Sequence, residues 1–179
     1  MTISLVVTVI GLDRPGLVSL LSDRGKAFGA SWAESRMASL AGQFAGIVHF
    51  QVPAENAESL AAALRELSAT GLRIVIAESG GTPGRTNARL LKLELVGQDR
   101  PGIIRDISRV LAESGISIEE LHTELVSAAW SAETLFQVKA LLLVPNTLAT
   151  DELRRPLETL ANELMVDITL DDSLTRAPV

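Results

Sequence analysis

Two short segments of the chain combine residue types that can bind a carboxylate. Both read Gly-X-Asp-Arg-Pro-Gly, and they lie at Gly11–Gly16 and Gly97–Gly102. An arginine guanidinium can hold a carboxylate through two parallel hydrogen bonds. Glycine lets a second backbone or a ligand approach closely, and the free N–H groups of a helix N-terminus attract negative charge. If each segment leads from a strand into a helix, its chemistry predicts a binding site for a small carboxylate, such as an amino acid.

The aspartates, prolines and arginines of these segments also have explanations that involve no ligand. Asp13 and Asp99 fall where a helix N-cap is expected, and a carboxylate there can accept hydrogen bonds from the first turn. The prolines would fix φ within that turn, and the arginines would be ordinary exposed side chains. Because both copies carry the whole combination, the duplication favours a role in ligand binding, for which the glycines are the strongest indication.

The two segments belong to a longer internal repeat. The spacing that separates them also relates residues upstream and downstream, namely Leu5 with Leu91, Ser22 with Ser108, Gly29 with Gly115 and Ser31 with Ser117. Self-similarity of this kind indicates a duplicated module. The sequence between the copies is rich in Gly, Ser, Thr and Pro, as flexible connections are. We therefore expect a first domain at residues 1–78, a linker at 79–88, a second domain at 89–172 and a tail at 173–179.

Hydropathy patterns predict the order strand, helix, strand, strand, helix, strand in each module. The first strands are apolar runs, Ile3–Ile10 and Leu90–Val96, and apolar residues at helical spacing follow each hexapeptide. Right-handed crossovers then give a four-stranded antiparallel sheet with both helices on one face. The expected fold class is α+β, with two ferredoxin-like βαββαβ sandwiches in tandem. Pro156 falls inside the last predicted helix and predicts that this helix starts late or kinks.

Composition disfavours several classes of function. A formal net charge of -6, no basic cluster and only 3% aromatic residues argue against direct binding of nucleic acid. No apolar stretch approaches the roughly 20 residues of a membrane span, and the first residues do not resemble a signal peptide, so we expect a cytoplasmic protein. The chain has no cysteine, and its histidines, His49 and His122, fall in different modules. We therefore expect no metal, no cofactor and no catalysis.

Both halves of the chain resemble the ACT domain family of amino-acid-binding regulatory modules. The resemblance lies in the order of a strand, the segment Gly-X-Asp-Arg-Pro-Gly, a helix and a second strand that begins with Gly-X-Ser. The second half also carries Glu120–Glu124 and, further on, Ser127–Phe136. These segments resemble the glycine cleavage system transcriptional repressor family, which has a long loop of the type Ser-Ala-Pro-X-Ser-Gly before Leu-Phe. Ala129 and Ala132 stand where that family often has proline and glycine. The resemblance covers nearly the whole chain.

This resemblance implies a function and a set of partners. Members of the repressor family are regulators without a DNA-binding helix-turn-helix that contact a LysR-type activator and respond to glycine. ACT domains bind ligands between paired modules near the loop after the first strand. Carried over to this sequence, the resemblance implies ligand binding by Gly11, Asp13, Arg14, Pro15, Gly16, Gly97, Asp99, Arg100, Pro101 and Gly102, and adds His122. Pairing of ACT modules also implies a homo-oligomer. Many serine-binding members carry asparagine in this loop where this chain has Asp13 and Asp99, so glycine and serine are both candidate ligands.

Two other functions remain open at this point. The chain would also fit a regulatory subunit of an enzyme of amino-acid metabolism, because such subunits use the same modules on a different partner. A paired structural domain that binds no ligand is the second alternative. Catalysis by the chain itself is disfavoured because regulatory modules occupy both halves.

Overall fold

The computed structural model describes residues 1–78, 87–127 and 134–172. The chain folds as two compact units, Met1–Pro83 (unit 1) and Gly84–Val179 (unit 2). Their division falls inside the segment that we expect to be a linker. Most of that linker, the loop that contains Ala129 and Ala132, and the tail from residue 173 lie outside the described residues.

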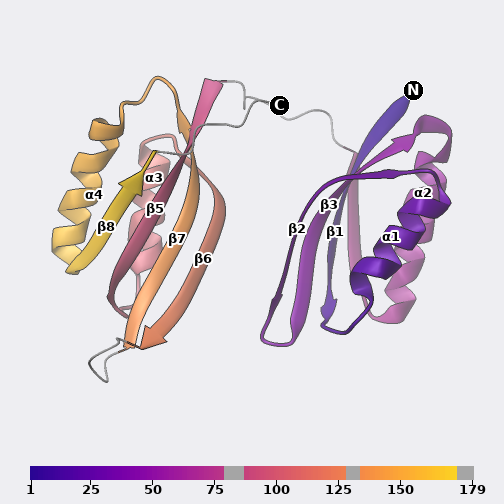
Figure 1. Ribbon diagram of the computed structural model, residues 1–179, viewed down its shortest axis with the longest axis horizontal. Helices are drawn as coiled ribbons and strands as arrows, with labels where there is room; N and C mark the ends of the chain where they lie inside the picture. The colour runs from indigo at the N-terminus through magenta and orange to yellow at the C-terminus, as the bar shows by residue number, and fades with distance from the viewer. Residues whose placement is uncertain (79–86, 128–133, 173–179) are drawn as a thin grey trace. The chain divides into compact units, whose positions relative to one another are not determined.

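Unit 1 is a four-stranded antiparallel sheet with two α-helices on one face (Figure 1). The strands follow the order β2-β3-β1-β4, so the first strand of the chain is an interior strand of the sheet. The elements are β1 (Thr2–Leu12), α1 (Leu17–Ala27), β2 (Ser31–Leu40), β3 (Gln43–Pro53), the short 3-10 helix η1 (Ala54–Asn56), α2 (Ala57–Glu66), the short 3-10 helix η2 (Leu67–Thr70) and β4 (Arg73–Glu78).

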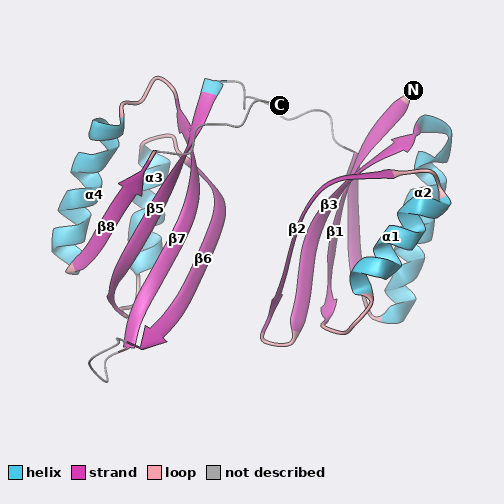
Figure 2. Cartoon of the chain, in the orientation of Figure 1, coloured by secondary structure: helices cyan, strands magenta, loops and turns pink. Residues whose placement is uncertain are grey.

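Unit 2 repeats this architecture, with strands in the order β6-β7-β5-β8 (Figure 2). Its elements are β5 (Ala88–Gln98), α3 (Ile103–Glu113), β6 (Ser117–Ser127), β7 (Thr134–Pro145), α4 (Thr150–Leu164) and β8 (Val166–Asp171). All paired strands are antiparallel. The predicted fold class, two ferredoxin-like α+β sandwiches in tandem, is therefore confirmed.

Alternation along the central strand builds a separate core in each unit. Leu5, Val7 and Val9 of β1 expose at most 2% of their surface, because every second residue of a strand points to the same face of the sheet. Helix α1 packs against this face through Leu17 and Leu21, which lie one turn apart. Unit 2 uses the equivalent residues of β5 and α3. In both units this packing fixes the position of the loop that joins the first strand to the first helix.

Pro156 does not delay or divide the last helix. Helix α4 begins at Thr150 and continues through Pro156 to Leu164. The side chain of Glu152 accepts a hydrogen bond of 3.2 Å from the N–H of Ala149 and so stabilises the helix start upstream of the proline. The predicted late start is therefore wrong, because burial of the apolar face of α4 outweighs the local cost of the proline.

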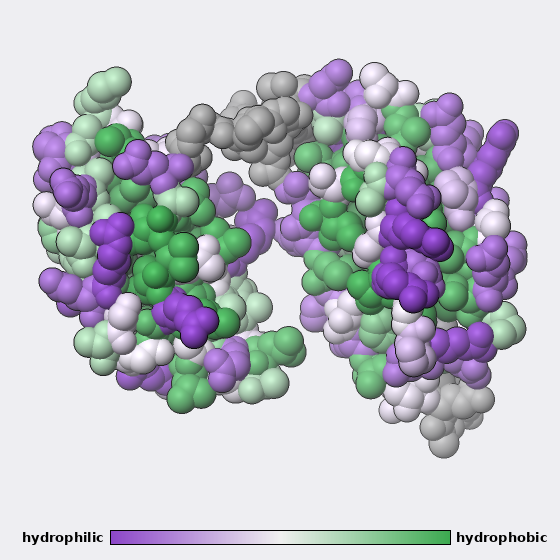
Figure 3. Space-filling view, turned by 180° about the vertical axis from the view of Figure 1, so that it is seen from behind, coloured by the Kyte–Doolittle hydropathy of each residue, from purple (hydrophilic) through white to green (hydrophobic). Residues whose placement is uncertain are grey.

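The sheet faces that point away from the helices differ between the units. Strand registers place equivalent rows across the two sheets: Arg36, Ile47, Thr8 and Val75 in unit 1, and His122, Lys139, Glu94 and Thr169 in unit 2. Ile47 and Val75 keep 50% and 60% of their surface exposed. Figure 3 shows that apolar side chains reach the surface in both units. This row of unit 1 thus has two exposed apolar side chains, whereas unit 2 has Lys139 in the place of Ile47 and Thr169 in the place of Val75.

Candidate functional site

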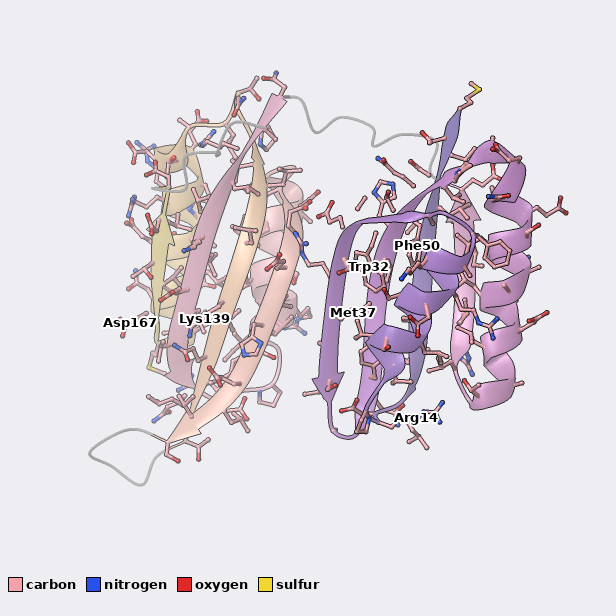
Figure 4. The ribbon with its side chains drawn as sticks, turned by 45° about the vertical axis from the view of Figure 1, so that its right-hand side comes forward. Arg14, Trp32, Met37, Phe50, Lys139 and Asp167 are labelled. Carbon is pink, nitrogen blue, oxygen red and sulfur yellow. The ribbon has the colours of Figure 1, made fainter. Side chains whose placement is uncertain are left out.

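Residues Asp13–Gly16 (loop 1), between β1 and α1, are tied to two distant segments of unit 1. The N–H of Asp13 donates a hydrogen bond of 2.9 Å to the carbonyl oxygen of Gly42, in the turn between β2 and β3. Arg14 Nη2 donates a hydrogen bond of 3.0 Å to the carbonyl oxygen of Thr70, at the end of η2 and shortly before β4. Figure 4 shows Arg14 at the end of the unit. Loop 1 is therefore held in place although its side chains are exposed.

The predicted capping role of the aspartates and prolines is wrong. Helix α1 has Gly16 as its N-cap, with φ of 92° and no side-chain hydrogen bond to the first turn. Helix α3 has the same arrangement at Gly102, with φ of 101°. Because these glycines are in the left-handed region, the chain turns once more before each helix, and the aspartates and prolines lie upstream of the first turn. The first-turn N–H groups remain available to an acceptor from outside the helix backbone.

Gly11 and Gly97 make room for side chains of the protein itself. A Cβ atom on Gly11, inside β1, would lie 2.7 Å from Leu72 Cδ2. A Cβ atom on Gly97, inside β5, would lie 2.9 Å from Val166 Cβ. Leu72 lies directly before β4, the last strand of unit 1, and Val166 is the first residue of β8, the last strand of unit 2. These two glycines are needed for packing within each sheet, and this packing explains them without a ligand.

A pocket of about 460 Å³ opens beside loop 1. Its volume falls in the range that is typical of small-molecule sites. Its lining combines a carboxylate, a guanidinium, two hydroxyl groups and apolar side chains, contributed by Asp13, Arg14, Gly16, Leu17, Val18, Ser19, Ser39 and Phe44. Of the residues that the sequence selected, the structure brings Asp13, Arg14 and Gly16 together there.

Three polar or aromatic residues of this pocket are not evident from the sequence pattern. Ser39 and Phe44 face each other across the β2–β3 hairpin and reach the pocket from the sheet. Ser19 lies in the first turn of α1. The hairpin register carries the signal that would have found Ser39, because it places this serine at the same end of the unit as loop 1.

The corresponding loop of unit 2, residues Asp99–Gly102 (loop 2), has a different environment. Asp99 and Pro101 are exposed, and Arg100 is half-buried. Immediately beyond loop 2, Arg105 Nε donates to Asp106 Oδ1 at 3.0 Å and Arg105 Nη2 donates to Asp106 Oδ2 at 3.3 Å. The hydrogen bond from Arg105 lowers the pKa of the Asp106 carboxyl. Loop 2 therefore borders an ion pair made by the chain itself.

Neither histidine adjoins the loop of its own unit. His122 of β6 is opposite Lys139 of β7, on the sheet face that points away from α3, so unit 2 does not bring it together with loop 2. His49 of β3 is opposite Glu34, and its Nε2 is buried without a hydrogen-bond partner in the described part of the chain. The described residues contain no group of three His, Cys, Asp or Glu arranged to hold a metal ion. None of their helices combines the length and apolarity needed to cross a membrane.

Comparison with known proteins identifies the class of this chain. The sequence profile of the ACT domain matches residues 4–76 and again residues 89–171, once in each unit. The chain therefore belongs to the ACT domain family and has two ACT domains in tandem. None of the curated proteins matches it.

Two solved structures share the whole tandem architecture. A protein of unknown function from Galdieria sulphuraria has 32% sequence identity and a TM-score of 0.86, and the match covers 97% of this chain and 100% of that one. A candidate glycine cleavage system transcriptional repressor has 19% identity and a TM-score of 0.70, with 96% and 97% covered. At this identity the second match shows that the fold is shared, and the activity of this chain is a separate question.

Proposed function

We propose that this protein is an amino-acid-responsive regulator, and not an enzyme, whose loop 1 binds a small amino acid. The pocket beside Gly16 is the observation that carries the proposal. It places a guanidinium and the first-turn N–H groups of α1 next to a carboxylate and two hydroxyl groups. These are the groups that a zwitterionic ligand requires.

Each charged end of such a ligand has a partner in this pocket. The ligand carboxylate would accept hydrogen bonds from the first turn of α1 and from the donors of Arg14 that do not contact Thr70. The ligand ammonium group would lie near the Asp13 carboxylate. Phe44 and Leu17 limit the space for a side chain, and the hydroxyl groups of Ser19 and Ser39 suit a ligand that is small or carries a hydroxyl. Glycine and serine are therefore the ligands that we propose.

The regulated partner that we propose is a LysR-type transcriptional activator, bound through protein contact in the cytoplasm. Two observations support this part of the proposal: the shared fold with the candidate glycine cleavage system repressor and the formal net charge of -6, which disfavours direct contact with DNA phosphates. A ligand controls such a contact only if it binds with different affinities to the state of the protein that contacts the activator and to the state that does not.

Self-association of two chains is part of the same proposal. The sheet face of unit 1 carries the exposed apolar side chains of Ile47 and Val75, whereas the equivalent positions of unit 2 carry Lys139 and Thr169. A twofold axis would bring this face against its own copy, so that the apolar side chains of the two chains cover each other.

Ile47→Lys, which installs the residue of unit 2, should then lower the molar mass measured by light scattering. His49→Leu, whose unit 2 counterpart is Leu141, is the control and should leave the mass unchanged.

A thermal-shift panel of the common amino acids tests the ligand. A compound that binds only the folded state raises the melting temperature, and we expect this for glycine or serine at millimolar concentration. Ser39→Ala should reduce the shift, whereas Ser68→Ala, outside the pocket, should not. No shift with any amino acid would contradict the proposal. Affinity purification of the tagged chain, with and without the ligand, then distinguishes a LysR-type partner from an enzyme of amino-acid metabolism.

A further inference from the structure

The two ACT domains differ at the glycine that begins the first helix of each. A Cβ atom built on Gly16 would meet no atom within 4 Å, so the space beside loop 1 is open. A Cβ atom built on Gly102 would lie 3.3 Å from Arg105 Nη2 and 3.7 Å from Asp106 Oδ2. The space that is open in unit 1 is therefore occupied in unit 2 by a guanidinium and a carboxylate.

This difference is encoded by two helix positions. Ser19 and Leu20 occupy in unit 1 the places of Arg105 and Asp106 in unit 2. Leu20 packs against the core of unit 1 and offers no carboxylate. Ser19 lines the pocket, where its short side chain leaves the space free that Arg105 fills in unit 2.

The group that fills the space in unit 2 has the chemistry of a bound ligand. The Asp106 carboxylate has only 15% of its side chain exposed, lies in the first turns of α3 and accepts two hydrogen bonds from one guanidinium. Arg109 Nη2 adds a second cation at 3.9 Å. An amino-acid carboxylate at loop 1 would likewise have a guanidinium as its partner, that of Arg14, and would in addition face the first-turn N–H groups of α1.

We infer that Asp106 substitutes for a ligand carboxylate in unit 2, so that loop 2 is occupied by the chain itself and only loop 1 takes a free amino acid. The inference rests on the proposed function. It assigns sensing to unit 1 and one ligand to each chain, although the Asp-Arg-Pro-Gly segment occurs twice.

Titration of the full-length protein with glycine and with serine tests this assignment. Isothermal titration calorimetry should give one ligand per chain. In nitrogen-15 NMR spectra of the same protein, the backbone amide signals of Gly16 and Leu17 should shift on addition of ligand, whereas those of Gly102 and Ile103 should not. This second measurement needs no substitution and is independent of any effect of a variant on folding.

Exchange of the two helix positions should change the stoichiometry. The double variant Arg105→Ser, Asp106→Leu gives α3 the residues that α1 has at the equivalent positions, and it should bind two ligands per chain. The reciprocal variant Ser19→Arg, Leu20→Asp should bind none. The control is Arg154→Gln, Asp151→Asn, which removes an exposed ion pair of 3.7 Å from α4 and should leave one ligand per chain.

The outcomes separate this inference from the proposed function. Two ligands per wild-type chain, or ligand-dependent shifts at Gly102, would overturn the inference and leave the proposed function intact. A folded Arg105→Ser, Asp106→Leu variant that still binds one ligand would do the same. Absence of binding to the wild type and to this variant, with both amino acids, would overturn the proposed function and the inference with it.

Discussion

Arg14 donates a hydrogen bond of 3.0 Å from Nη2 to the carbonyl oxygen of Thr70, which lies 56 residues further along the chain. Thr70 ends the short helical turn before β4, and its own Oγ1 donates to the carbonyl oxygen of Leu67 at 2.7 Å. The hydrogen bond to Thr70 orients the guanidinium at the edge of the loop 1 pocket. Arg14 is thus positioned before a ligand arrives, which reduces the entropic cost of binding.

Arg14→Gln should weaken ligand binding far more than it weakens the fold. We expect a loss of affinity of at least about tenfold, which corresponds to about 1.4 kcal/mol, because the cation that pairs with the ligand carboxylate is removed. The free energy of unfolding should fall by about 1 kcal/mol or less, since one exposed hydrogen bond is lost. Calorimetry and urea unfolding measure the two effects. The control is Lys26→Ala, which also removes a cation but at the far end of α1 from loop 1. Equal ligand affinities of the two variants would contradict the role of Arg14.

Gly97→Ala should destabilise unit 2 by about 1 to 3 kcal/mol, as overpacking of a well-packed core does. The added methyl group would clash most closely with Val166 Cγ1 and would lie 2.9 Å from its Cβ. Val166→Ala removes the nearest side-chain atoms, so the double variant should be more stable than the sum of the two single effects predicts. Urea unfolding of the four proteins gives the coupling. If the changes in unfolding free energy of the two single variants simply add in the double variant, contact with Val166 is not the reason that position 97 requires glycine.

Pro156→Ala should stabilise unit 2 by about 1 to 3 kcal/mol, because alanine restores a backbone N–H in the helix interior and removes the clash of the proline ring. Helix α4 already continues through this position, so the substitution requires no change of fold. A higher melting temperature and urea midpoint should result. Glu158→Ala, exposed on the same helix, serves as the control and should change stability little. An unchanged or lower stability of Pro156→Ala would contradict this expectation.

The Arg105–Asp106 pair should give unit 2 a contribution to stability that disappears in acid. The hydrogen bond from Arg105 lowers the pKa of Asp106 in the folded chain, so the ionised carboxylate stabilises the fold above the usual carboxyl pKa. This contribution is lost as the pH falls through the lowered folded value. The difference in free energy of unfolding between wild type and Asp106→Asn should thus be constant above about pH 5 and shrink below it.

Urea unfolding at a series of pH values measures that difference. Introducing Asp106→Asn into an Arg105→Gln background is the control, because the donor that lowers the pKa is then absent and the pH dependence should be weaker. A difference that stays constant down to about pH 2 would show that the pair does not affect stability.

Most of the fold could be predicted because its signals are local or repeated. The apolar, β-branched run Ile3–Ile10 predicts a strand, and the internal repeat predicts the same architecture twice. Two local predictions failed. Asp13 does not cap α1 because Gly16 is in the left-handed region, and α4 does not start late because packing along its whole apolar face outweighs the effect of Pro156.

The sequence by itself determined that this protein has two ACT modules and that Asp13, Arg14 and Gly16 belong to a loop after the first strand, because residue type and spacing carry that information. Only the tertiary structure decided what surrounds each loop. Ser39 joins the pocket through a hairpin register, Thr70 orients Arg14 from a distant segment, and the Arg105–Asp106 pair fills the space beside Gly102. These relationships depend on distances between atoms of different elements or turns, and two identical motifs can therefore have different environments.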